Sequence, residues 1–195
     1  MGCVANLKLS SAGVGPLLQR DYWGIIAGCR FKPSELIDWV AGRFTEFAPT
    51  DRAIFSLPVQ GRSLEVGDEL TVRIRAAGAA YVRVLAKDSQ SFTLGTIEGH
   101  PEAGRITFGA YRNSCGDVLF HIRSRARSSA RLILLGFLVI GDPMQIHTWA
   151  DFVQAVAMSA GEGIIGFIHA ETLRLPDGFE DDLDGSRPTF IAVGD

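Results

Sequence analysis

Hydrophobic and polar residues alternate through the middle of the chain. Between residues 53 and 127, apolar side chains recur at every second position, which is the period of a strand with one buried face. The pattern predicts strands at residues 70–74, 81–85, 92–96, 106–110 and 118–124. Short turns containing Gly or Asp separate these segments, so we expect successive hairpins of an antiparallel sheet. Strands that follow one another without helices exclude a parallel doubly wound sheet, in which each crossover needs its own helix.

A helical period flanks this region on both sides. Before it, Pro33 suits a first helical turn and Pro49 ends the helical segment. The apolar stripe between them consists of Leu36, Ile37, Val40, Phe44 and Phe47. After the strand region, Asp142 can cap a second helix that has Pro143 at its first position. The apolar face of this second helix consists of Ile146, Trp149, Val153, Val156 and Ala157.

The predicted elements follow an order that is known from helix-grip folds. A short aromatic strand at residues 21–29 precedes the first helix, and the long helix follows the run of strands. We therefore expect an α+β fold in which a curved antiparallel sheet wraps a long C-terminal helix, as in the birch-allergen (Bet v 1) and START lipid-transfer proteins. We assign residues 1–20 to an N-terminal leader, 21–162 to a single domain and 163–195 to a C-terminal extension, in which 164–170 could add an edge strand.

Composition narrows the class of protein and of partner. Hydrophobic residues make up 47% of the 195 and charged residues 21%, which is ordinary for a chain with a substantial core. The formal net charge of −3 provides no global field that would attract nucleic acid. The longest apolar run, residues 132–140, is far shorter than the roughly 20 residues of a membrane-spanning helix. Cys3, Cys29 and Cys115 lack metal-ligand spacing, so we expect reduced thiols in a cytoplasmic protein.

The turn Gly99-His100-Pro101-Glu102, followed by Gly104, is the first candidate for chemistry. Its glycines permit backbone torsions that other residues adopt only with strain. In a functional interpretation, Glu102 orients the imidazole of His100, or either group acts as an acid–base catalyst. In a structural interpretation, Glu102 accepts backbone hydrogen bonds within the turn and His100 packs over it. No Ser, Cys or Asp at a recognisable spacing completes a catalytic triad, so the catalytic residues stay unknown, with His100 and Glu102 as candidates.

A row of arginines is the second candidate. Arg123, Arg125 and Arg127 share one face of a predicted strand, where forked donors suit a carboxylate or phosphate. A solvated outer face is the simpler interpretation. The three histidines His121, His147 and His169 have no metal-ligand spacing, so the sequence predicts neither a metal site nor a cofactor.

The region that contains the turn and the arginine row resembles a known family. The segment from Thr96 to Phe108, with the Gly-His-Pro-Glu turn, and the strand from Phe120 to Arg125 are similar to the signature of the DUF1990 (UPF0548) family, and a weaker resemblance extends over residues 65–157. The family has no assigned activity, so the resemblance implies a shape and not a reaction. Many members carry a basic or polar residue at the position of Arg125, which makes Arg125 the arginine of choice for a site. Many also end in a strongly basic helix, whereas DPMQIHTWADFVQAVA is almost free of positive charge.

The leading functional hypothesis is a module that binds a small apolar or amphipathic ligand between the sheet and the C-terminal helix. The ligand-binding candidates are His100, Glu102 and Arg125, which would orient the ligand, and Trp149, which either lines the cavity or belongs to the core. One alternative is an enzyme of polyketide-cyclase type, in which Glu102 or His100 moves a proton. Another is a structural or interaction protein with a packed core. The sequence leaves the ligand and the oligomeric state open.

Overall fold

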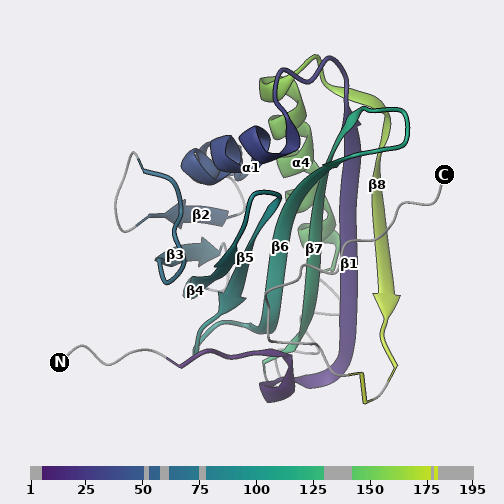
Figure 1. Ribbon diagram of the computed structural model, residues 1–195. Helices are drawn as coiled ribbons and strands as arrows, with labels where there is room; N and C mark the ends of the chain where they lie inside the picture. Colours follow the sequence, from purple (N-terminus) through teal and green to yellow (C-terminus); the bar gives the residue numbers. More distant parts are fainter. Residues whose placement is uncertain are drawn as a thin grey trace.

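One antiparallel eight-stranded sheet forms the body of the molecule (Figure 1). The computed structural model describes residues 6–50, 53–57, 62–74, 78–129, 142–176 and 178–179. The strands are β1 (Val14–Ile26), β2 (Ala53–Ser56), β3 (Glu69–Ile74), β4 (Gly78–Lys87), β5 (Ser91–Thr96), β6 (Glu102–Arg112), β7 (Val118–Ser128) and β8 (Ile164–Arg174). The helices are the 3₁₀ turn η1 (Ser10–Ala12), α1 (Pro33–Gly42), α2 (Phe44–Phe47) and α4 (Asp142–Ala160). Their order confirms the α+β class.

The strand order in the sheet is β2-β3-β4-β5-β6-β7-β1-β8. The strands from β2 to β7 are neighbours in sequence and in space, which confirms the predicted hairpins. β7 then pairs with β1, and β8 adds to the other side of β1 as an edge strand, as residues 164–170 suggested.

The sheet extends past both of the expected domain boundaries. β1 begins at Val14 and not at residue 21, so residues 14–20, which the sequence analysis placed in the leader, are part of the sheet. Strand pairing explains the difference, because Leu18, Gln19 and Arg20 each have a partner on β7 and another on β8. The C-terminal extension likewise supplies all of β8.

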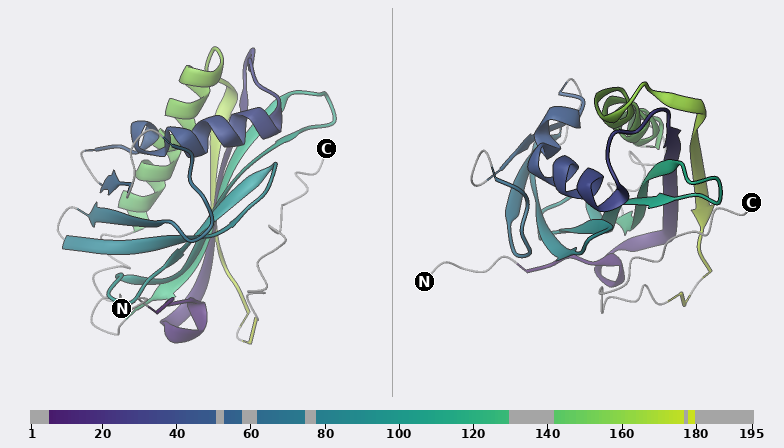
Figure 2. Two further views of the ribbon diagram at one scale, coloured as in Figure 1. Left: turned by 60° about the vertical axis from the view of Figure 1, so that its left-hand side comes forward. Right: turned by 45° about the horizontal axis from the view of Figure 1, so that its top comes forward.

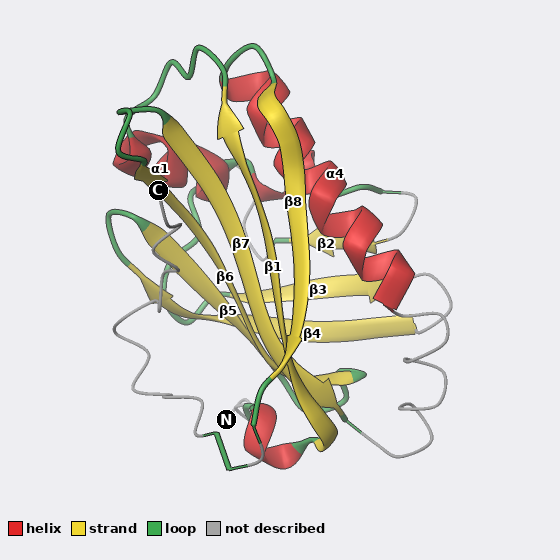
Figure 3. Ribbon diagram, turned by 90° about the vertical axis from the view of Figure 1, so that its right-hand side faces the viewer, coloured by secondary structure: helices red, strands yellow, loops and turns green. Residues whose placement is uncertain are grey.

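The sheet is curved, and α1 and α4 lie on the same side of it (Figure 2). Viewed from the side, α4 runs along this inner face, while β8 forms the edge next to β1 (Figure 3). α1 begins where Pro33 predicted, and the backbone N–H of Lys32 donates to the carboxylate of Glu35 at 2.9 Å to cap it. The apolar stripe continues from α1 into α2 across a short break at Arg43. Within the described residues, no helix is both long and apolar enough to cross a membrane.

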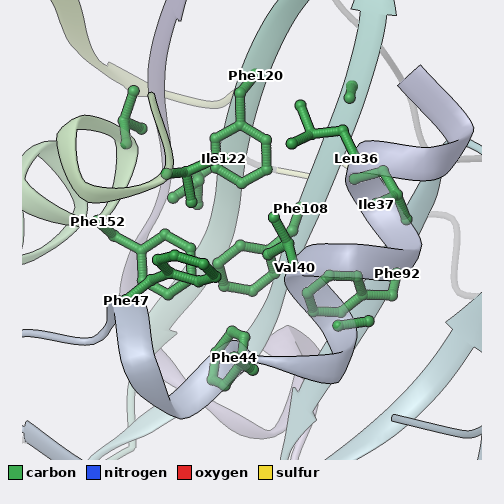
Figure 4. Packing of buried hydrophobic residues seen from close by; sticks show 14 of the residues in the cluster. Leu36, Ile37, Val40, Phe44, Phe47, Phe92, Phe108, Phe120, Ile122 and Phe152 are labelled. Carbon is green, nitrogen blue, oxygen red and sulfur yellow. The ribbon is translucent and has the colours of Figure 1, made fainter. Parts of the chain in front are cut away.

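An aromatic cluster joins the helices to the sheet (Figure 4). The ring of Phe44 on α2 meets Phe92 at 5.9 Å and Phe108 at 5.2 Å, both in edge-to-face geometry. Phe152 on α4 lies 5.4 Å from both Phe44 and Phe108. Each fully buried Phe contributes about 1.5–3 kcal/mol through burial alone, and aromatic pairs add about 0.5–1.5 kcal/mol. Around Phe44 and Phe108, the space between the sheet and the helices is therefore filled by aromatic rings.

Three features noted in the sequence lie outside the described residues. They are Cys3, the apolar run at 132–140 and the part of the C-terminal extension that follows residue 179.

Candidate functional site

The Gly-His-Pro-Glu turn connects β5 to β6 and buries His100. Gly99 has a φ of 93°, which confirms that a glycine is needed there. The backbone N–H of His100 donates to the carbonyl of Ile97 at 3.0 Å and closes the turn. The imidazole Nδ1 accepts the backbone N–H of Glu102 at 3.0 Å and lies 3.2 Å from the Glu102 carbonyl oxygen. Burial lowers the pKa of His100 to about 4, so the ring is neutral at neutral pH.

Gly104 is a glycine for a different reason. Its φ lies outside the left-handed region, but a Cβ at this position would be 2.6 Å from the Cα of Ala126 and would also overlap the carbonyl oxygen of Arg125. The backbone of β7 therefore excludes any side chain here. Backbone torsion, the expected reason for both glycines of the motif, is therefore the wrong reason for Gly104.

The carboxylate of Glu102 lies on the inner face of the sheet, close to a buried arginine. Glu102 is two residues from Gly104 and an even number from Phe108, so the pleat places its side chain on the face that bears the core. Arg20 precedes the core residue Tyr22 by two positions on β1, so its side chain lies on this same inner face. Nη1 of Arg20 and Oε1 of Glu102 are 3.9 Å apart, and their side chains are 0% and 17% exposed.

Small hydroxyl residues accompany this pair. Ser124 on β7 is the register partner of Arg20, and Ser128 is the partner of Glu102. Both serines are buried. We call Arg20, Glu102, Ser124 and Ser128 the inner polar group. Sequence reasoning found only Glu102, since Arg20 was assigned to the leader.

Arg125 lies on the opposite face from the inner polar group. Its Nε donates to Oε1 of Gln19 at 2.8 Å, and Nε2 of Gln19 donates to Oδ2 of Asp21 at 2.9 Å. The Arg125 guanidinium also lies 5.2 Å from the centre of the Phe179 ring. The arginine row does share one face, as predicted, but Arg125 is buried, so the expected solvated face is not observed at this position.

Asp21 is the centre of this outer network. Its Oδ1 accepts from Nε of Arg123 and from Nε2 of His121, both at 2.7 Å. Burial alone would raise the pKa of Asp21, but the hydrogen bonds from His121 and Arg123 outweigh it and hold the pKa below its usual value. The hydroxyl of Tyr111 lies 3.1 Å from Nδ1 of His121, and burial raises the pKa of Tyr111 to about 12. We use the name outer network for Gln19, Asp21, Tyr111, His121, Arg123 and Arg125. Their polar groups are paired with one another, which favours a structural role.

The remaining candidates are dispersed. Trp149 on α4 is half-buried, with its ring 5.7 Å from Phe108, at the border of the aromatic cluster. His147 is exposed on α4, and His169 on β8 stacks on Trp23 at 4.7 Å. Among the residues that the structure describes, no three metal-ligating side chains gather to form a site. The structure thus brings together Glu102 and the turn of His100, but neither Arg125 nor the other histidines.

Comparison with protein families places these residues in a known context. Residues 33–155 match the family model described as "Domain of unknown function (DUF1990)". The chain belongs to the DUF1990 family. This match confirms the resemblance drawn from the Gly-His-Pro-Glu turn and the strand that ends at Arg125. The search of curated proteins finds no match.

Solved structures show the fold of this DUF1990 chain. A norcoclaurine synthase from Thalictrum flavum, in complex with a transition-state analogue, is 10% identical with a TM-score of 0.54 over 75% of this chain and 96% of its own. A ginseng major latex-like protein from Panax ginseng is 13% identical with a TM-score of 0.50 over 75% and 99%. The KanY protein is 8% identical with a TM-score of 0.53 over 77% and 100%. These likenesses confirm the Bet v 1-like helix-grip fold.

Proposed function

We propose that this DUF1990 domain binds a small amphipathic molecule against the inner face of its sheet, with Arg20 and Glu102 as the contacts for the polar end of the ligand. The observation that carries the proposal is the fully buried Arg20 side chain, 3.9 Å from the Glu102 carboxylate on the face that bears the core.

A gain in folding stability does not explain why Arg20 and Glu102 are placed together in the interior. Removing a guanidinium from water costs several kcal/mol, and a buried ion pair repays that cost only with excellent geometry. Charged groups placed in an otherwise apolar binding site commonly orient a ligand.

The position of the pair along the strands agrees with this role. Glu102 is the first residue of β6 and Ser128 the last of β7, whereas Arg20 and Ser124 lie level with Ile106, so the inner polar group extends from the end of these strands to the border of the aromatic cluster at Phe108. An amphipathic molecule would place its polar end at Arg20 and its apolar part toward Trp149. His100 then supports the site indirectly, because its ring holds the backbone of Glu102.

A structural neighbour supports the class of ligand. The norcoclaurine synthase of Thalictrum flavum was solved in complex with a transition-state analogue, so a small molecule binds to one protein of this fold. At 10% identity the neighbour says nothing about which molecule this chain would bind.

The catalytic alternative stays a prediction. A pKa of about 4 leaves the imidazole of His100 neutral at neutral pH, so the ring is a poor general acid, and its Nδ1 already accepts the N–H of Glu102. Acid–base chemistry would therefore depend on Glu102.

Native and denatured masses of the freshly purified protein test the binding proposal. We expect the native mass to exceed the denatured mass by a reproducible amount, and we expect fatty acids or aromatic polyketides to raise the melting temperature. The double variant Arg20→Met with Glu102→Gln should remain folded and lose both effects, since it removes the polar anchor while keeping the volume. Arg73→Met, at an exposed arginine on β3, is the matched control and should keep both. If the unmodified protein shows no mass excess and no thermal shift, the proposal is contradicted and a packed interaction domain is favoured.

A further inference from the structure

β8 is a long sheet edge that carries exposed apolar side chains. Within the described residues it pairs only with β1, at one end of the strand order. Phe167 is 82% exposed, Ile165 49% and Leu173 43%. Nine of the eleven β8 residues are exposed, and only Ile164 and Ile168 are half-buried.

An edge of this kind is a template for pairing with another strand. Among the described strands, only β1 pairs with β8, and monomeric proteins commonly protect such edges with short strands, Lys or Pro. The opposite edge follows this rule, since β2 has four residues. β8 has eleven residues, IIGFIHAETLR, and contains neither Lys nor Pro. Its register against β1 is irregular over residues 166–168, where Gly166 has a positive φ, and this irregular part includes Phe167.

We propose that β8 pairs antiparallel with β8 of a second copy of this chain, across a two-fold axis at Ala170. In that register Phe167 lies opposite Leu173 of the other copy, and His169 lies opposite Glu171. Residues directly opposite each other in an antiparallel pair have Cβ atoms about 4.5–5.5 Å apart and interact. The pairing matches apolar with apolar side chains and an imidazole with a carboxylate.

Neighbouring registers lack this match. An axis at His169 sets Phe167 against Glu171, and an axis at Glu171 sets two carboxylates against each other. A shift of the pairing by a single residue would place the inner face of one sheet beside the outer face of the other. An axis at Ala170 pairs apolar with apolar and imidazole with carboxylate side chains at once, and this self-complementarity of β8 favours a second copy as the partner.

β8 also lies outside the part of the chain that the family model matches. That match covers residues 33–155, whereas β8 spans Ile164–Arg174. The proposed interface is separate from the ligand site proposed above.

Sedimentation equilibrium over a range of protein concentrations tests the dimer. We expect a dimer mass that dissociates on dilution, and we expect Phe167→Lys combined with Leu173→Lys to give a monomer at every concentration. Ile54→Lys is the matched control, because Ile54 is 47% exposed on the opposite edge strand, and it should leave the dimer intact. A monomeric unmodified protein, or a dimer that survives both lysines, would overturn the proposal.

Cross-linking tests the register. In a background with Cys3→Ser and Cys115→Ser, Ala170→Cys should form an intermolecular disulfide on oxidation, because it faces itself across the axis. Directly opposed Cα atoms are about 4.5–5.5 Å apart, within the roughly 4.4–6.8 Å range of disulfides. Thr172→Cys should not cross-link, since it faces Ile168. Cross-linking at Thr172 but not at Ala170 would contradict the proposed axis.

Discussion

Burial sets the protonation state of His100. The ring is 7% exposed, and its Nδ1 serves as the acceptor for the backbone N–H of Glu102. A protonated ring would lose this acceptor and would place a charge in an apolar environment. The imidazole therefore stabilises the start of β6 in its neutral form.

This state predicts a pH dependence of stability. The folded pKa of about 4 lies below the value of 6.5 for an unperturbed histidine, so between these pH values the unfolded chain binds a proton that the folded chain does not. The contribution of His100 is fully present above pH 6.5 and is lost as pH falls toward about 4, by roughly 3 kcal/mol in total.

His100→Asn checks this contribution, because the Asn side chain can still accept the Glu102 N–H but does not titrate. Urea unfolding at several pH values should show a flatter dependence in the variant than in the unmodified protein. His147→Asn, at an exposed position on α4, should leave the dependence unchanged. Equal slopes for His100→Asn and the unmodified protein would show that His100 is not held neutral by the fold.

At the scale of elements, close backbone approach holds β6 against β7. Gly104 pairs with Ala126, and there is no room for a Cβ between the two strands. The outer network adds a second link, between β7 and β1, through Asp21 and its two donors His121 and Arg123. These links position Glu102 relative to Arg20, which lies two strands away.

The two glycines of the turn motif should differ in their response to substitution. Gly104→Ala requires the backbone of β7 to move, and overpacking of this kind costs about 3 kcal/mol or more. Gly99→Ala meets open space and has only the strain of a positive φ, which costs about 1–2 kcal/mol. Free energies of unfolding of the two variants compare these costs directly. A larger loss for Gly99→Ala would mean that the turn, and not the strand approach, limits this region.

At the scale of the whole molecule, the aromatic cluster makes helices and sheet one cooperative unit. Phe44 on α2 contacts β2, β5, β6 and α4 through the rings of Phe55, Phe92, Phe108 and Phe152. Loss of the Phe44 ring should weaken the contacts of α2, α4 and the sheet together, since the ring touches all three.

Phe44→Ala should therefore lower the free energy of unfolding by about 3–5 kcal/mol, the usual cost of a buried Phe→Ala substitution. Far-ultraviolet and near-ultraviolet circular dichroism should show coincident thermal transitions at a lower temperature. Met158→Ala removes a large apolar side chain that is 59% exposed, and it should change stability little. Separate transitions for the two probes would indicate that the helices and the sheet unfold independently.

Local periodicity determined most of the architecture. The two-residue period of β3 to β7, the apolar stripe from Leu36 to Phe47 and the helical period of the long helix are properties of short segments, so the α+β class and the helix-grip order follow from them. The Gly-His-Pro-Glu turn also identified the family, and Gly99 adopts the torsion expected of it.

Long-range pairing decided the rest. Gly13, Gly15 and Pro16 give residues 1–20 the composition of a loop, yet pairing with β7 and β8 makes a strand from Val14 onward. The pairing of Arg20 with Glu102 and of Asp21 with His121, 100 positions apart in sequence, depends on the register of β1 against β7. Register also placed Arg125 on the face opposite Glu102. The sequence by itself determined the strands from β3 to β7 and the main helical segments, because that information is local. The tertiary structure decided where β1 begins and which polar side chains meet, because strand register joins residues that no local pattern connects.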